Sequence, residues 1–198
     1  MGTWWVIIQL FLLSHDLSAT GVPVAWMLAS SATTATISFF VAWVRDASPA
    51  VSPAIIMTDR DQAQIAALMA IYLKSNIFLC TWHVLRAIRS HFATSEFPVL
   101  WDKIKKLVTT EEIAAFYALQ DEIFADPSVP QSIVDYLSTN WMPVVHMWAR
   151  SARNGWSIFE EGDTNMLIEL YVNHWTLYSP DKITDKDLVI IMYWKPIF

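Results

Sequence analysis

The sequence has little cysteine, little glycine and no excess of basic residues, and each shortage excludes a class of protein. Its 198 residues include a single cysteine, Cys80, so no disulfide can form within the chain, as is typical of a reducing compartment. Nineteen acidic residues against thirteen basic ones give a net charge of −6, whereas nucleic-acid-binding proteins usually carry a basic excess. Any contact with nucleic acid must therefore be confined to local basic patches.

The sequence also lacks a long apolar run, although 55% of its residues are hydrophobic and its mean hydropathy is +0.35. The early run from Trp4 to Leu13 is interrupted by Gln9, and a membrane span needs roughly 20 apolar residues. No basic segment precedes this run, so we expect no secretory signal. We expect a nuclear or cytoplasmic protein with no membrane span, while the hydropathy keeps a membrane-associated protein open as a further interpretation.

The four glycines form neither a phosphate-binding loop nor a Gly-x-Ser-x-Gly nucleophile turn. Cys80-x-x-His83 has the spacing of metal ligands, but a structural zinc site needs four ligands and there is no second cysteine. A buried thiol followed by a hydrogen-bonding histidine is the favoured interpretation, and zinc bound together with scattered histidines is the weaker alternative.

Short apolar strands alternate with helical patterns in the first half of the chain, which predicts an α/β fold with parallel pairing. Strands are predicted at residues 1–16, 21–28, 54–58 and 76–80. Helices are predicted at residues 30–44, 59–74 and 81–92, with buried stripes at Ile37, Phe40, Val41 and Val44 and at Ile65, Leu68, Met69 and Tyr72. We expect Pro23 to lie near a strand start or at a sheet edge.

Pro98 begins a helical regime, in which Thr109-x-x-Glu112 predicts a capping box for the helix that follows. The predicted organisation is a sheet core at residues 1–97, a helical insertion at 98–154, a core helix at 155–178 and a C-terminal tail at 179–198. The tail has a weak strand or helix pattern from Leu188 to Trp194 and no chemistry of its own.

Two carboxylates are candidates for a site. Asp59 directly follows a central apolar strand, at the sheet edge where sites of α/β folds gather, although it could instead only cap the next helix. Glu169 lies in the predicted helix 155–178, on one side with Asn165 and Asn173, where a solvated face is the alternative. If that helix packs beside the sheet edge, the two carboxylates converge and suit a hard cation such as Mg²⁺.

Five segments, in order, resemble a Mutator-like element (MULE) transposase domain over roughly residues 10–178. The segments are Gly21–Leu28, Ile56–Ile65, Leu79–Ala87, Trp141–Ala149 and Asp163–His174. The resemblance implies an incomplete RNase H-like mixed sheet with flanking helices and an all-helical insertion between the second and third acidic residues of an Asp-Asp-Glu site.

In that family the site binds Mg²⁺ or Mn²⁺ and cuts and joins DNA at transposon ends. The resemblance implies that Asp59 and Glu169 are the second and third catalytic residues and metal ligands, with Cys80 and His83 beside the site. Arg86, Arg89, Asn165 and Asn173 are candidates for DNA contact, which we expect to be weak and salt-dependent.

The sequence departs from the family at its start. The family's first Asp lies on a strand upstream of the segment that matches residues 9–13, and Met1 to Ile8 contain no acidic residue. Leu170, Val172 and Thr176 also replace a Ser, a His and a basic residue of the last motif. We therefore expect a truncated copy that lacks the first catalytic Asp, does not transpose alone and has a tendency to self-associate. The alternative is a non-catalytic interaction module that uses its Trp-rich helical insertion.

Overall fold

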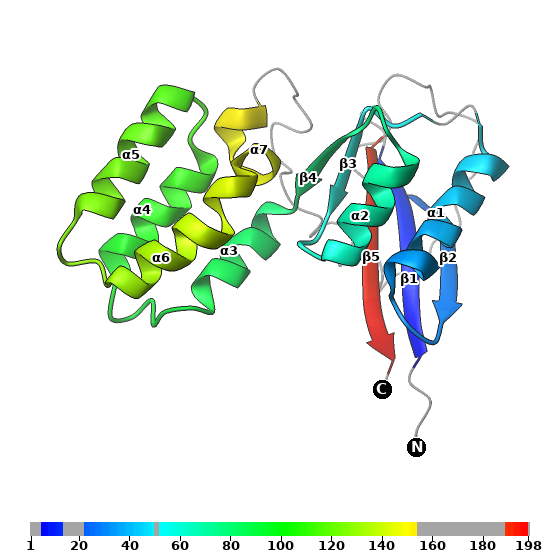
Figure 1. Ribbon diagram of the computed structural model, residues 1–198, viewed down its shortest axis with the longest axis horizontal. Coiled ribbons are helices and arrows are strands. Elements are labelled where there is room, and N and C mark those ends of the chain that lie inside the picture. The colour runs from blue at the N-terminus through cyan, green and yellow to red at the C-terminus, as the bar shows by residue number, and fades with distance from the viewer. Residues whose placement is uncertain (1–4, 14–21, 50–51, 154–188, 198) are drawn as a thin grey trace. The chain divides into compact units, whose positions relative to one another are not determined.

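The computed structural model describes residues 5–13, 22–49, 52–153 and 189–197 (Figure 1). Its contacts divide the chain into two compact units. The sheet unit comprises Met1–Cys80 and Ile158–Phe198, and the helical unit comprises Thr81–Ser157. Among the described residues, no helix has both the length and the hydropathy that crossing a membrane requires.

The sheet unit is built on one five-stranded mixed sheet, which confirms the predicted α/β class. Its strands are β1 (Trp5–Leu13), β2 (Val22–Ala29), β3 (Ile55–Thr58), β4 (Asn76–Leu79) and β5 (Val189–Ile197). They lie in the order β2-β1-β5-β3-β4, with β1 antiparallel to β2 and β5, and β3 parallel to β4 and β5. Since β2 is an edge strand, it tolerates Pro23, as predicted.

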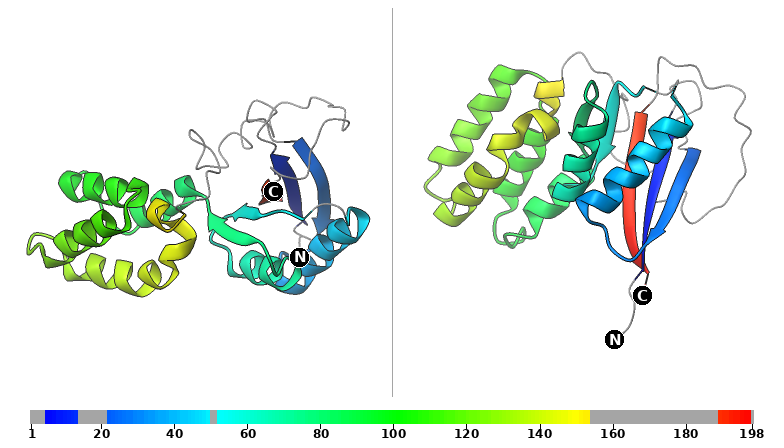
Figure 2. Two further views of the ribbon diagram at one scale, coloured as in Figure 1. Left: turned by 90° about the horizontal axis from the view of Figure 1, so that it is seen from above. Right: turned by 45° about the vertical axis from the view of Figure 1, so that its right-hand side comes forward.

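Helices α1 (Thr34–Ala47) and α2 (Gln62–Ile71) pack against each other and lie on the same face of the sheet (Figures 1 and 2). The predicted stripe of α1 is buried at all four of its positions. The Thr33 hydroxyl caps this helix by accepting the Thr36 N–H at 3.2 Å. All four residues of β3 are buried as well, as expected of a strand with neighbours on both sides.

The helical unit packs short helices around three aromatic rings. Its elements are α3 (Thr81–Arg89), α4 (Pro98–Thr109), α5 (Ile113–Ala125), α6 (Gln131–Asn140), α7 (Val145–Trp148) and the short 3₁₀ helices at Met142–Val144 and Arg150–Arg153. Trp148 packs against Trp141 with ring centroids 6.1 Å apart and against Phe116 at 5.7 Å. The Trp148 indole N–H donates to the Trp141 carbonyl at 2.9 Å, so its polar atom is satisfied inside this core.

Several local predictions were wrong, among them the end of α2, which lies at Ile71 and not at the predicted Lys74. The capping box does not form, because the Thr109 hydroxyl donates back to the Lys105 and Lys106 carbonyls at the end of α4, and Glu112 is an N-cap without a side-chain bond. Met69 is 59% exposed instead of buried. Helix α3 ends at Arg89, before the predicted Phe92.

The C-terminal residues take a place that the sequence did not indicate. The strand alternative for Leu188 to Trp194 is the one that forms, and β5 lies inside the sheet between β1 and β3. The predicted helix at 155–178 falls outside the described residues. Helix α3 groups with the helices that follow it instead of with the sheet.

Candidate functional site at the end of strand β3

Asp59 and Cys80 follow the ends of two neighbouring parallel strands. Thr58 at the end of β3 pairs with Leu79 at the end of β4. The Cys80 N–H donates to the Thr58 carbonyl at 3.0 Å, which ties the two strand ends together. The predicted site residue Asp59 therefore lies at the carboxyl edge of the sheet, where ligands of α/β folds bind.

Asp59 is half-buried and leads into helix α2 without capping it. The cap is Asp61, whose carboxylate accepts the Gln64 N–H at 2.9 Å. The alternative interpretation, in which Asp59 only caps this helix, is therefore wrong, because the N-cap is Asp61. The signal was present in the sequence, since Asp61 followed three residues later by Gln64 has the spacing of an N-cap.

A polar pair lies beneath this strand end, and the sequence analysis missed it. Thr58 and Gln64 are both fully buried, and the Thr58 hydroxyl donates to Gln64 Oε1 at 2.6 Å. Gln64 Nε2 is buried and has no hydrogen-bond partner among the residues that the structure describes. A polar residue inside the apolar pattern of α2 was the available signal, because a buried amide demands a partner.

Cys80 is buried, as predicted for its thiol. His83 lies in α3 of the helical unit, half-buried, with its ring edge-on to Trp82 at 4.7 Å between centroids. Within the described ranges, no group of three or more His, Cys, Asp or Glu residues is arranged to hold a metal ion.

The exposed side of α3 is basic. Arg86 and Arg89 are both exposed, while Thr81, Val84 and Ile88 are buried on the opposite side of the helix. The Arg86 guanidinium lies over the Trp82 ring at 5.0 Å from its centroid. This cation–π contact orients one of the two charges while leaving it accessible.

The other predicted site residues, Glu169, Asn165 and Asn173, lie outside the described residues. The distance between the Asp59 and Glu169 carboxylates is therefore not part of the described geometry. Asp61 uses its carboxylate as a helix cap, so Asp59 is the remaining acidic side chain at this strand end among the described residues. One carboxylate does not make the ligand set that Mg²⁺ requires.

A comparison with protein-family models shows what the segment around this strand end is similar to. Residues 6–87 match the model of the MULE transposase domain. This segment is therefore similar to a MULE transposase domain, and it makes up less than half of the chain. A search of curated proteins found no match.

The match to the MULE transposase domain includes Asp59, Cys80, His83 and Arg86, and it ends before Arg89 and the last two resembling segments. It covers strands β1 to β4 and helices α1 and α2, together with most of α3. Strand β5 lies outside it.

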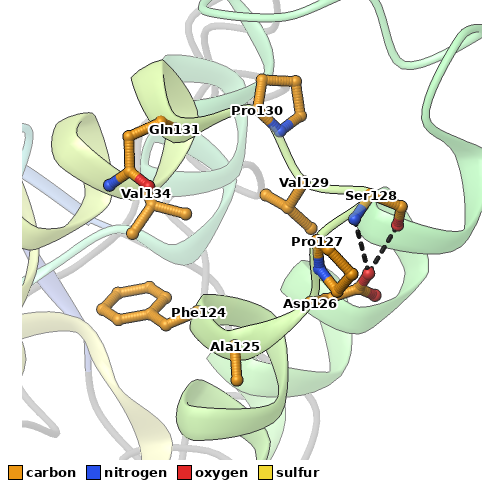
Figure 3. A pocket seen from close by; sticks show the side chains of 9 residues that line it. All are labelled: Phe124, Ala125, Asp126, Pro127, Ser128, Val129, Pro130, Gln131 and Val134. Atoms are coloured by element: carbon orange, nitrogen blue, oxygen red, sulfur yellow. Dashed lines mark hydrogen bonds between the residues drawn. The ribbon is translucent and has the colours of Figure 1, made fainter.

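A separate hollow of about 620 Å³ lies in the helical unit, at the connection between α5 and α6 (Figure 3). Phe124, Val129 and Val134 are among its apolar lining residues. The Asp126 carboxylate there accepts the Ser128 N–H at 2.9 Å and the Ser128 hydroxyl at 2.6 Å, and it pairs with Lys103 at 3.2 Å. The charged group of this hollow is thus used in holding the turn between α5 and α6.

Proposed function

We propose that this chain is a transposase-derived domain that contacts DNA through α3 and does not carry out strand transfer alone. The observation that supports the proposal is the position of Asp59 directly after a central strand, within the segment that matches the MULE transposase domain. By resemblance, Asp59 and Glu169 are the second and third members of an Asp-Asp-Glu site on an RNase H-like sheet, and Mg²⁺ or Mn²⁺ is its metal.

The metal part of the proposal is tested by isothermal titration of Mg²⁺ and Mn²⁺ into the protein and into an Asp59→Ala/Glu169→Ala variant. A retained site gives weak binding to the protein and less binding to the variant. Equal heats for both proteins would contradict a role for these two carboxylates in metal binding.

The DNA contact is assigned to Arg86 and Arg89, whose charges are exposed on one side of α3. Each phosphate contact contributes about 0.9 to the slope of log K against log salt concentration. Fluorescence anisotropy with a labelled duplex should show weak binding that becomes weaker and less salt-dependent in an Arg86→Gln/Arg89→Gln variant.

An Arg45→Gln/Lys105→Gln variant is the matched control for that experiment. It also removes two positive charges, but these are already paired: Arg45 with Asp46 at 2.8 Å and Lys105 with Asp102 at 2.7 Å. The control should retain the salt slope of the unmodified protein. Equal losses in both variants would show that net charge, and not α3, determines binding.

An interaction module is the second candidate, and in the helical unit Trp141 and Trp148 are buried and therefore not available for it. The observation that favours it is on α1, where Phe39 and Trp43 are 69% and 57% exposed and lie one helical turn apart. Exposed apolar residues grouped in this way mark protein interfaces, and a second copy of the chain is the partner we assign.

Light scattering after size exclusion tests this candidate. Self-association through α1 should be lost in a Phe39→Ser/Trp43→Ser variant and kept in an Ile113→Ser/Tyr117→Ser control. The control removes an aliphatic and an aromatic residue that are 46% and 47% exposed on α5. A monomer at all concentrations would exclude the self-association.

A further inference from the structure

The strands that match the MULE transposase domain form two separate pairs in the sheet. Strands β1 and β2 pair antiparallel, and β3 and β4 pair parallel, but neither member of one pair is bonded to the other pair. A single strand position separates β1 from β3, and β5 fills it (Figure 1). The matched segment is thus joined into one sheet by residues from outside the match.

Strand β5 bonds to both neighbours along their length. It pairs with β1 from Trp5↔Ile197 to Leu13↔Val189, and with β3 from Ile55↔Val189 to Thr58↔Met192. Removing β5 would leave an edge of β1 and an edge of β3 with unpaired N–H and C=O groups, which favours aggregation.

Strand β5 runs in the direction that a strand would take if it came directly before β1 in the sequence and was joined to it by a hairpin turn. A strand joined to β1 by a hairpin turn runs antiparallel to it, and next to β3 such a strand would run parallel to β3. This is the pairing of β5 on both sides. Its last residue, Ile197, pairs with the first residue of β1, Trp5, so residue 198 and residues 1–4 would suffice as a hairpin loop, since such loops commonly have two to five residues.

We propose that β5 takes the sheet position of the strand that the resemblance places before β1. This inference rests on the proposed transposase ancestry. Because Thr58 pairs with Met192, continuing the register by one residue places position 193 beside Asp59. Residues 189–197 contain no Asp or Glu, so the sheet is completed without a carboxylate next to Asp59.

A circular permutant of the full chain tests the strand position. The variant starts at Asp187, runs to Phe198, continues directly into Met1 and ends at Lys186, so that β5 precedes β1 and every residue is kept. Since the strand keeps its neighbours, we expect cooperative unfolding with a melting temperature within a few degrees of the original and unchanged amide protection in β1 and β3.

A permutant with the same twelve residues in scrambled order is the control, and it should not protect β1 and β3. Loss of the sheet in the permutant with the native segment would overturn the proposal. So would equal protection in the scrambled control, because β5 would then not be the strand that joins the two pairs.

A second test asks whether position 193 is the one beside Asp59. A carboxylate placed there by Tyr193→Asp should tighten Mn²⁺ binding by about tenfold or more, because a second charged oxygen ligand reaches the same ion. Adding Asp59→Ala should remove the gain. Trp194→Asp is the matched control and should give no gain, since neighbouring positions of a strand face opposite sides of the sheet.

An equal gain from both substitutions, or a gain that survives Asp59→Ala, would overturn the assigned register. If the Tyr193→Asp variant does not fold, the circular permutant and its scrambled control decide the proposal. The outcomes are separate from the proposed function, because DNA binding by α3 can fail while the permutant folds, and the reverse can also occur.

Discussion

At the scale of single residues, the strand end at Asp59 is supported by a buried polar pair. Thr58 and Gln64 are both inaccessible to solvent, and a hydrogen bond of 2.6 Å joins the hydroxyl to the amide oxygen. Removing one partner of a buried hydrogen bond lowers the free energy of unfolding, because the other partner stays desolvated and unpaired. This pair therefore fixes the first turn of α2 relative to the end of β3.

A Thr58→Val substitution should lower the free energy of unfolding by about 1–3 kcal/mol, since it leaves the Gln64 amide oxygen buried without its donor. Urea denaturation measures the change. The double variant Thr58→Val/Gln64→Leu should be less destabilised than the sum of the two single variants, because both polar partners are then removed. Additive losses would show that the two side chains do not act as a pair.

Asp126 makes the stability of the folded state depend on pH in the acid range. The two hydrogen bonds from Ser128, together with the Lys103 ammonium, lower the pKa of this carboxyl from 3.8 to about 2. A carboxyl with a lowered pKa stabilises the folded state fully above its unfolded pKa, and this contribution is lost as the pH falls from about 4 toward 2.

An Asp126→Asn variant should therefore be less stable than the original near neutral pH and lose less stability between pH 4 and pH 2. Thermal melts of both proteins over this range measure the difference. Asp121→Asn is the control, because it removes an exposed carboxylate from α5, the helix that ends just before Asp126. The same acid sensitivity in both variants would contradict a specific role for Asp126.

At the scale of elements, helix starts depend on which polar side chain reaches the first free N–H groups. Asp61 accepts the Gln64 N–H at the start of α2, whereas Thr109 turns back to bond the carbonyls of α4. The two positions carry similar sequence signals. The direction in which the chain leaves the preceding element decides whether the side chain caps the next helix or closes the last one.

An Asp61→Ala substitution should destabilise the protein by about 1 kcal/mol, as is typical for the loss of an N-cap. Asp61→Asn keeps an oxygen acceptor and should cost much less. Denaturation midpoints of the two variants measure this, and the same loss in both would show that the charge of Asp61 matters more than its cap.

At the scale of the whole molecule, the chain forms two compact units that divide after Cys80. The helical unit has its own aromatic core, in which Phe116, Trp141 and Trp148 are buried. The sheet unit has a separate core in which the buried side of α1 and the strand β3 take part. Each unit therefore has the means to unfold on its own.

A Trp148→Ala substitution should destabilise the helical unit by about 3–5 kcal/mol, the usual cost of a large cavity in a core. Helical circular dichroism should report an earlier transition, while amide protection in β3 and β4 stays unchanged. Simultaneous loss of protection in both units would show that they unfold as one.

Much of the local structure follows from the sequence by itself. The apolar spacing in α1, the continuous apolar run of β3 and the helical pattern after Pro98 all lead to the observed elements, because burial of one helix side or of a central strand requires those residue types. The position of Asp59 after β3 and the resemblance to the MULE transposase domain also come from the sequence, and the family match confirms the latter.

The tertiary structure alone decided how the sheet is completed. The C-terminal pattern predicts no more than a weak strand or helix, and nothing in residues 189–197 indicates which strands they join. Pairing is a non-local property, since β5 lies between β1 and β3, which are far from it along the chain. Backbone hydrogen bonds carry no sequence signal for their partner, so the sequence determined the strands and only the folded chain determined their neighbours.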